Sequence, residues 1–414
     1  RKAALRRLVE ALRARQDELL RTLALEAGKP LKAARVEIER CLETLTLSAE
    51  EATRIAGAVE PINHSPRTRG YDCFVRRVPV GVCSCITPFN FPLNLAAHKI
   101  GPAIAAGCPF VLKPAEKTPI TSALLAEALR ACDLPPGSWS VFLCDVSDVG
   151  PLVEDDRAAL LSFTGSDRVG WALKAQAGRK KVVLELGGNA ACVVDETADV
   201  AYAADRVAAG AFSYAGQSCI SVQRVYALAS VADAFAQALT ERAAALVVGD
   251  PLDETVDVGP VIDDAAAERL DAWIDEAVDR GARVLTGGRR QGRLVQPTVL
   301  FSPPEDASVV RCEVFGPVVS VIAVESFEEA LDRVNDSEFG LQAGVFTNRL
   351  DRALTAWEQL EVGGVVVNDA STFRADAMPY GGVKRSGLGR EGVRSAIEHM
   401  TEPRVLVVNR QAGA

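Results

Sequence analysis

The chain has 414 residues, of which 48% are hydrophobic and 24% are charged. This length allows two to three domains with sizeable cores, and the composition is that of an ordinary soluble globular protein. The formal net charge of −9 excludes the broad basic face that nucleic-acid binding requires, so we expect no nucleic-acid partner.

The first 58 residues show helical periodicity, beginning with Leu5, Leu8 and Leu12, and predict two helices joined near residues 28–30. Because the pattern is already under way at Arg1, we expect further residues before it in the natural protein. The segment "PINHSPRTRG" reads as a loop, and "YDCFVRRVPVGVCSCITP" reads as strand.

From residue 80 the sequence alternates between short apolar runs and helical segments. Five such runs are "VGVCSCITP", "PFVLKP", "WSVFLCD", "ALLSFTGS" and "KVVLELGG". This alternation predicts a parallel sheet with helices on both faces. In such sheets ligands bind beyond the carboxyl ends of the strands, which is where "ITPFN", "LKPAE", "FTGS" and "LELGG" fall.

A second α/β series begins near residue 190 with "AACVVDETAD" and continues through "SVQRVYAL", "VVSVIAVES" and "AGVFTN". We place a domain boundary near residues 187–188. The longest apolar stretch, around residues 95–112, is interrupted by His98 and Lys99, so we expect no membrane span.

The ten cysteines are scattered and form no C-x-x-C pair. In a chain of this length that pattern favours free thiols in a reducing cytoplasm over a disulfide framework. The chain has only three histidines, so a histidine-built zinc site is not expected and we predict no metal.

The stretch "SYAGQSCIS" places Cys219 among small and polar residues, close to Gly216. A reactive thiol must be accessible and must gain thiolate character, and a nearby glycine permits a tight turn and the close approach of a substrate. The alternative is a structural cysteine in a buried helix, and this stretch alone does not separate the two.

Polar residues also follow three apolar strands. Glu185 is either a cap or ion-pair partner, or a general base with a pKa raised by its apolar surroundings. Asn90 is either a turn residue or an amide donor to a developing oxyanion. Lys113 and Glu116 are either an exposed ion pair or donors and acceptors for a ribose or phosphate.

Residues 387–392, "GLGREG", match the pattern G-x-G-x-x-G. A dinucleotide fingerprint requires a strand before it, a helix after it and an acidic residue about 20 positions on, within one βαβ unit. The preceding stretch, "MPYGGVKRSG", does not read as such a strand, and the chain ends soon afterwards. We therefore do not assign a nucleotide to this motif.

Taken together, the motifs resemble the aldehyde dehydrogenase superfamily, in particular its NAD(P)-dependent hydrolytic branch of lactaldehyde and semialdehyde type. Seven stretches occur in the order found in that family, from about residue 80 to the end of the chain: "ITPFNFP", "VLKPAEKTP", "FTGSDRVG", "LELGGNA", "GQSC", "CEVFGPV" and "MPYGGVKRSGLGRE". The helices before residue 60 are also similar to the family.

The resemblance implies an α/β fold with a Rossmann-like cofactor domain, a second α/β catalytic domain and a small β arm for oligomerisation. We assign residues 1–60 and 80–187 to the dinucleotide-binding domain and residues 188–390 to the thiol-bearing domain. Residues 61–79 and 391–414 are assigned to the arm and tail. The family assembles as homodimers or homotetramers, and exposed strand edges in the arm fit such contacts.

The resemblance further implies that Cys219 attacks a small aldehyde, that Asn90 and the Cys219 backbone N–H stabilise the oxyanion, and that Glu185 activates water to hydrolyse the thioester. Glu116 favours NAD, with NADP as the alternative, because a carboxylate repels a 2′-phosphate. The implied cofactor contacts are Ile86, Thr87, Pro88, Phe89, Lys113, Glu116, Gly165, Ser166, Val169, Gly187, Glu313 and Phe315.

The substrate is expected to be a small hydroxylated or anionic aldehyde. The candidate substrate residues are Phe91, Tyr214, Thr372, Phe373 and Arg374, and Arg374 is either an anion clamp or a structural ion-pair partner. Three other functions are alternatives. The first is a CoA-acylating dehydrogenase, which tends to lack a base like Glu185, and the second is an inactive protein on the same scaffold. The third is a cysteine hydrolase, which would need a histidine partner.

Overall fold

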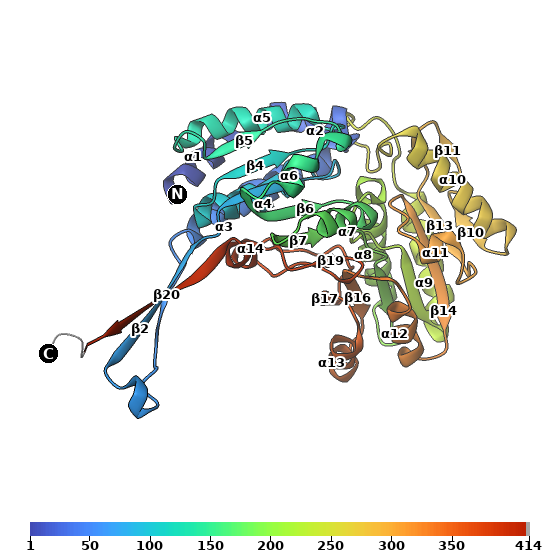
Figure 1. Ribbon diagram of the computed structural model, residues 1–414. Coiled ribbons are helices and arrows are strands. Elements are labelled where there is room, and N and C mark those ends of the chain that lie inside the picture. Colours follow the sequence, from blue (N-terminus) through green and yellow to red (C-terminus); the bar gives the residue numbers. More distant parts are fainter. Residues whose placement is uncertain (411–414) are drawn as a thin grey trace.

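The computed structural model describes residues 1–410, which form two α/β bodies and one projecting arm (Figure 1). The first body carries a six-stranded sheet, the second a seven-stranded sheet, and the arm a three-stranded sheet. This confirms the predicted α/β fold class. Within residues 1–410, every helix is too short or too polar to cross a bilayer.

The sheet of the first body has the strand order β19-β7-β6-β3-β4-β5, and only β19 runs antiparallel to its neighbour. As predicted, the strands are short apolar runs, and each parallel strand ends in a polar or glycine-containing segment at the same edge. The strands are β3 (Val82–Ile86), β4 (Phe110–Lys113), β5 (Trp139–Val141), β6 (Ala158–Thr164), β7 (Lys181–Glu185) and β19 (Gly387–Leu388).

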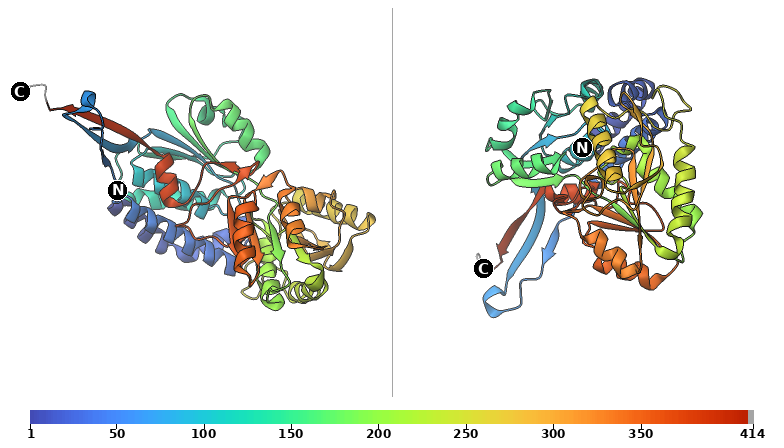
Figure 2. Two further views of the ribbon diagram at one scale, coloured as in Figure 1. Left: turned by 90° about the horizontal axis from the view of Figure 1, so that it is seen from below. Right: turned by 90° about the vertical axis from the view of Figure 1, so that its right-hand side faces the viewer.

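The helices of the first body cover both faces of this sheet (Figures 1 and 2). Helix α4 is buried along its whole length between the sheet, α3 and α14. The helices and 3₁₀ turns outside the arm are α1 (Lys2–Arg13), α2 (Gln16–Ala27), α3 (Leu31–Glu51), α4 (Asn94–Ala106), α5 (Pro119–Leu129), η2 (Arg130–Cys132), η3 (Val146–Asp148), α6 (Gly150–Glu154), α7 (Asp167–Gln176) and α14 (Val393–His399).

The first 58 residues hold three helices, where the sequence predicts two. The break near residues 28–30 is present, because Gly28 takes a left-handed conformation after α2. A second break lies at residues 14–15, between α1 and α2. Arg15 leaves the helical region there, with φ −111° and ψ 16°, and its guanidinium pairs with Glu18 and Glu127. The apolar periodicity continues across this break, so the sequence gives no sign of it.

The sheet of the second body has the order β10-β13-β14-β9-β8-β16-β17 and is parallel except for β10. Its strands are β8 (Ala191–Val194), β9 (Arg224–Leu228), β10 (Arg283–Thr286), β13 (Thr298–Phe301), β14 (Val318–Val324), β16 (Gln342–Phe346) and β17 (Gly364–Val367). Its helices are α8 (Val200–Phe212), η4 (Ser213–Gly216), α9 (Ala229–Ala244), α10 (Asp264–Asp279), α11 (Ser308–Arg311), α12 (Phe327–Asn335) and α13 (Leu350–Gln359).

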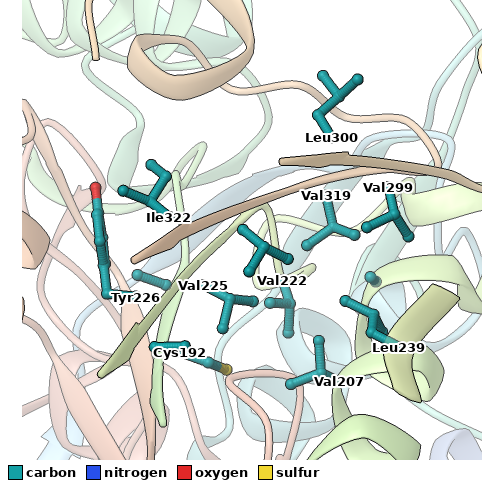
Figure 3. Close-up of a cluster of buried hydrophobic side chains, with 14 of the residues drawn as sticks. Cys192, Val207, Val222, Val225, Tyr226, Leu239, Val299, Leu300, Val319 and Ile322 are labelled. Carbon is teal, nitrogen blue, oxygen red and sulfur yellow. The ribbon is translucent and has the colours of Figure 1, made fainter. Parts of the chain in front are cut away.

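Valine, leucine and alanine side chains from both faces of the second sheet form its core (Figure 3). Val225 on β9 and Val319 on β14 are fully buried there, together with Val207 on α8 and Leu239 on α9. Two short antiparallel strand pairs complete the second body: β11 (Arg290–Gln291) with β12 (Leu294–Val295), and β15 (Phe339–Gly340) with β18 (Val383–Lys384).

The arm consists of β1 (Ala58–Glu60), β2 (Tyr71–Pro79), which follows the turn η1 (Pro66–Thr68), and β20 (Thr401–Asn409). It projects away from both bodies (Figure 1) and leaves apolar side chains exposed on β20. The division expected from the sequence differs from these contacts near the C-terminus. Strand β19 pairs with β7 and α14 packs on α4, so residues 387–399 belong to the first body. Residues 411–414 of the expected tail lie outside the described residues.

Candidate active site

A cavity of about 600 Å³ lies between the two bodies. Asn90 and Glu185 line it from the first body, and Cys219 lines it from the second. The three residues singled out for chemistry are therefore gathered at one site, although 129 positions separate the first from the last in the sequence. The loop between β17 and α14 closes the cavity with Arg374 and Tyr380.

The turn before Cys219 is tight and strained. Tyr214, Ala215 and Gly216 follow one another with φ values of 51°, 53° and 67°, a conformation that costs roughly 1–2 kcal/mol for each non-glycine residue. A Cβ at Gly216 would lie 2.1 Å from the Gly316 carbonyl oxygen, so only glycine fits. This turn ends α8 and brings Cys219 to the cavity wall.

The Cys219 Sγ atom lies 3.2 Å from the Tyr380 hydroxyl. Burial raises the pKa of the Cys219 thiol to about 12, while the hydrogen bond from Tyr380 and the positive charge of Arg374 oppose that rise. The neighbouring backbone is closely packed, since a Cβ at Gly188 would lie 2.2 Å from the Cys219 carbonyl oxygen. The sulfur is thus held at a fixed place beside a phenol hydroxyl.

Glu185 ends strand β7, and its two carboxylate oxygens are buried without a hydrogen-bond partner. Burial raises the pKa of Glu185 well above its ordinary value, and the charge of Glu391 raises it further. Glu391 is ionised instead: its burial is outweighed by Lys99 and other nearby cations, which lower its pKa to about 2. Two neighbouring carboxyls with opposite pKa shifts are typical of an acid–base site.

Asn90 follows β3, and its Nδ2 donates to the Gln217 carbonyl at 3.1 Å, while its Oδ1 has no partner. One amide hydrogen is therefore free to point into the cavity. The Asn90 carbonyl accepts a 2.7 Å hydrogen bond from the buried Lys29 ammonium, and Lys29 also pairs with Glu37. This pair fixes the backbone that carries the amide.

The residues expected to contact a dinucleotide fall into two groups. Those that line the cavity are Pro88, Phe89, Gly165, Ser166, Gly187, Glu313 and Phe315. Outside it, Ile86 and Thr87 end β3, Lys113 and Glu116 follow β4 as an ion pair, and Val169 on α7 packs beside the sheet. The Oγ1 atoms of Thr87 and Thr164 are buried without partners, so this edge has unused polar groups for a ligand, as a dinucleotide site requires.

Glu313 and Gly187 are fitted to each other. Glu313 Oε1 accepts the Gly188 N–H at 3.0 Å, and a Cβ at position 187 would lie 2.5 Å from Glu313 Oε2. Burial raises the pKa of Glu313 to about 7. The ring of Phe315 packs edge-on against Phe89 with centroids 6.1 Å apart, and together they form one wall of the cavity.

Four of the five substrate candidates, Phe91, Tyr214, Thr372 and Arg374, line the cavity. Phe373 does not: its side chain is 47% exposed, and its backbone holds the loop through a carbonyl that accepts from Gln342. The chain turns at this point, since the Phe373 N–H donates to the Ala370 carbonyl at 3.1 Å. Thr372 and Arg374 line the cavity from this turn, and Phe373 does not.

Sequence reasoning missed Tyr380, Lys29, Glu37, Lys99 and Glu391. One signal for them was present: Lys99 lies inside α4, a helix apolar on all sides, and a charge there requires a buried partner. That partner is Glu391, whose Oε1 accepts from Lys99 Nζ at 3.0 Å. The sequence does not reveal which carboxylate reaches Lys99, because the two lie 292 positions apart.

Comparisons with known proteins identify the family of the chain. The profile described as "Aldehyde dehydrogenase family" matches residues 1–406. The chain belongs to the aldehyde dehydrogenase family. As the sequence predicted, it is an NAD(P)-dependent enzyme that oxidises an aldehyde to a carboxylic acid.

Among family members, the chain is similar to the 3-sulfolactaldehyde dehydrogenase of Priestia megaterium, with 47% identity over 98% of this chain and 85% of that protein. The structure of aldehyde dehydrogenase 21 from Physcomitrella patens, solved with the product succinate, has a TM-score of 0.97 at 42% identity and covers 100% and 86% of the two chains. Glyceraldehyde-3-phosphate dehydrogenase GapN from Methanocaldococcus jannaschii, complexed with NADP, has a TM-score of 0.94 at 40% identity, over 99% and 89%.

Proposed function

We propose that this aldehyde dehydrogenase oxidises a small aldehyde that carries an anionic group, and that Cys219, Glu185 and Asn90 are its catalytic residues. The observation that carries the proposal is a single cavity in which these three residues lie beside a buried guanidinium, that of Arg374. Three similar proteins are named for, or were solved with, a sulfonate, a carboxylate or a phosphate compound, which supports the same class of substrate.

The reaction begins when the Cys219 sulfur adds to the aldehyde carbon. A sulfur–carbon bond forms, and the π electrons of the carbonyl move to oxygen. The free amide hydrogen of Asn90 and the Cys219 backbone N–H are the donors for that oxyanion, and fixed donors of this kind stabilise charge that develops in the transition state. The carbonyl then re-forms with loss of hydride, and a thioester remains on the sulfur.

A bound nicotinamide dinucleotide supplies the acceptor for that hydride. Gly165, Ser166, Gly187 and Glu313 line the side of the cavity where its nicotinamide end would lie, and Lys113 and Glu116 follow β4 at the same sheet edge. Glu116 lies at the exposed side of that edge and carries a negative charge, which favours NAD, since a 2′-phosphate would be repelled there.

Glu185 completes the reaction by removing a proton from water as the water attacks the thioester. The sulfur–carbon bond breaks, the carboxylic acid leaves, and Cys219 is restored. A CoA-acylating enzyme would need a thiol in place of this water, and the buried carboxyl beside the sulfur favours water. Acid should therefore form from the aldehyde without CoA. Formation of product only when CoA is present would contradict this step.

The charges around Arg374 support an anionic substrate. A connected cluster holds three cations, Arg40, Lys99 and Arg374, and two carboxylates, Asp376 and Glu391; Arg40 is partly exposed and the other four side chains are buried. Two carboxylates cannot neutralise three cations, so one positive charge is left over in a site from which water is largely excluded. An anion that enters the cavity would balance it.

The neighbouring titratable groups do not remove this excess charge. His98, which contacts both Asp376 and Arg374, stays neutral because burial and the Arg374 charge lower its pKa. Burial raises the pKa of Glu185 well above its ordinary value, which favours its neutral form. The Nε of Arg374 is buried without a partner, which leaves one N–H available to an incoming carboxylate, sulfonate or phosphate.

The test compares two four-carbon aldehydes, succinic semialdehyde and butanal, in the Arg374→Leu variant. The matched control is Arg157→Leu, an exposed arginine that pairs with Asp155 alone. We expect kcat/KM for succinic semialdehyde to fall about 10²- to 10³-fold more than for butanal, the effect of removing one partner of a buried charge pair. An unchanged ratio between the two aldehydes would end the anion-clamp proposal.

We also propose how the parts of the chain are used. Residues 1–57 and 80–187, with β19 and α14, form the cofactor-binding domain, and the second body, from residue 188, is the catalytic domain. The exposed apolar strand β20 in the arm supports assembly into a homodimer or homotetramer, and sedimentation as a monomer at micromolar concentration would contradict it. The ten free cysteines support work in a reducing cytoplasm.

A further inference from the structure

We infer that Tyr380 is a further catalytic residue, whose phenol donates a hydrogen bond to the thiolate of Cys219. The inference rests on the proposed function, since it assumes that Cys219 is the nucleophile. Its basis is the 3.2 Å contact between Tyr380 Oη and Cys219 Sγ. A hydrogen bond to a charged acceptor is about twice as strong as one between neutral groups, so this contact favours ionisation of the sulfur.

The position of Tyr380 is fixed by its backbone. Its N–H donates to the Glu391 carbonyl at 3.0 Å, and its own carbonyl accepts the Glu391 N–H at 2.6 Å. The next residue, Gly381, has φ +153°, and a Cβ there would lie 2.7 Å from Glu185 Oε1. The loop is therefore packed against the general base on one side while it holds the phenol against the nucleophile on the other.

The ring of Tyr380 is held as firmly as its backbone. The side chain is buried, with the residue 3% exposed, and the Arg374 guanidinium lies over the ring at 3.7 Å from its centroid. A cation over an aromatic face is attracted to it, more strongly when both are desolvated. Arg374 thus positions the ring of Tyr380 from one face, and it adds a positive charge near the sulfur.

The direction of the hydrogen bond follows from the protonation states. Burial raises the pKa of Tyr380 well above its ordinary value, so the phenol keeps its proton throughout the working pH range. When Cys219 ionises, its proton leaves to solvent, the negative charge stays on sulfur, and sulfur can then only accept. The phenol remains neutral and is the donor in that state.

Other charges also act on the sulfur. Arg374 favours the thiolate, whereas Glu313 and Glu185 oppose it whenever they are ionised. Burial raises the pKa of Glu185 well above its ordinary value, which weakens its opposition to the thiolate. Tyr380 provides the side-chain hydrogen bond that Cys219 Sγ makes within residues 1–410.

The decisive variant is Tyr380→Phe, which keeps the ring, the stacked guanidinium and the backbone pairing, and removes one oxygen atom. The measurement is the rate at which iodoacetamide alkylates Cys219 as a function of pH, read by peptide mass spectrometry because the chain has ten cysteines. Burial keeps the pKa of the Cys219 thiol high, so the profiles are compared at pH values below it, where we expect the alkylation rate to fall about 10- to 100-fold, the worth of one hydrogen bond to a charged group. Tyr202→Phe, which alters an exposed tyrosine, is the matched control and should leave the profile unchanged.

A second measurement uses the opposite chemical change. When 3-fluorotyrosine replaces the five tyrosines, the phenol becomes a stronger donor with almost the same shape, and the alkylation rate at those pH values should rise. A Tyr380→Phe profile that superimposes on that of the unmodified enzyme would overturn the inference. The Cys219→Ser variant tests the proposed function separately from the Tyr380 inference. Full turnover in Cys219→Ser would contradict the proposed function. An inactive Cys219→Ser together with an unchanged Tyr380→Phe profile would contradict the Tyr380 inference alone.

Discussion

Substitution of Lys29 by Met should destabilise the enzyme and disturb the segment that carries Asn90. Lys29 and Glu37 have fully buried side chains, and Lys29 Nζ lies 3.9 Å from the ring centroid of Phe91 and 4.2 Å from that of Tyr214. The variant leaves the Glu37 carboxylate buried without its cation. Removal of one partner of a buried pair costs about 3–5 kcal/mol.

The expected value lies at the lower end of that range, because Glu37 keeps other partners. Its Oε1 accepts the backbone N–H groups of Leu93 and Asn94 at 2.9 and 3.2 Å, so part of its charge stays solvated by the start of α4. We therefore expect Lys29→Met to lower the free energy of unfolding by ~3 kcal/mol. Loss of the bond to the Asn90 carbonyl should also slow hydride transfer.

The assay is urea unfolding, followed by tryptophan fluorescence, of Lys29→Met, Glu37→Leu and the double variant. If the two side chains act as a pair, the double variant should lose about 1–3 kcal/mol less than the sum of the single variants. In a stopped-flow measurement of the hydride burst, Lys29→Met should slow an enzyme with Asn90 more than an Asn90→Ala enzyme. Additive losses in both measurements would refute the reasoning.

Three shorter predictions concern the site itself. Asn90→Ala should lower the hydride burst rate about 10²- to 10³-fold, the usual effect of losing one oxyanion donor, while the dissociation constant of the cofactor stays unchanged. Glu116→Ala should raise the kcat/KM ratio of NADP to NAD by about tenfold or more, because a like charge beside the 2′-phosphate is removed; an unmoved ratio would place the preference elsewhere. Burial raises the pKa of Glu185, so the ionised form that acts as a base appears only at higher pH. The steady-state rate should therefore fall as the pH drops through that raised pKa. Glu185→Gln should lose this pH dependence, and its rate should be lower by about 10²-fold or more.

The sequence predicted the parts of this fold that depend on local pattern. The parallel strands and their binding edge follow from short apolar runs that end in polar or glycine residues, and Cys219, Glu185 and Asn90 all lie beside such features. The resemblance to one family then joined stretches that local patterns could not connect. Neither the local patterns nor the resemblance predicted the boundaries that tertiary contacts set. These are the break at residues 14–15 and the return of residues 387–399 to the first body.

The buried charge network was beyond sequence reasoning for a different reason. Lys99 reaches Glu391, and Arg40 reaches Asp376, across 292 and 336 positions, and no periodicity relates residues so far apart. Phe373 shows the converse limit. It stands between two cavity residues in the sequence, yet it does not line the cavity, because the direction of a side chain at a turn depends on a backbone conformation that composition does not fix.

The central claim is a covalent bond between the aldehyde carbon and Cys219. The most direct measurement mixes the Glu185→Gln variant with cofactor and succinic semialdehyde, quenches with acid, and analyses the digested chain by mass spectrometry. We predict that the peptide containing Cys219 gains the mass of the aldehyde less two hydrogens, and that the amount of this adduct equals the amount of reduced cofactor formed in the burst. A full burst with no adduct on Cys219, or with the adduct on another residue, would contradict it.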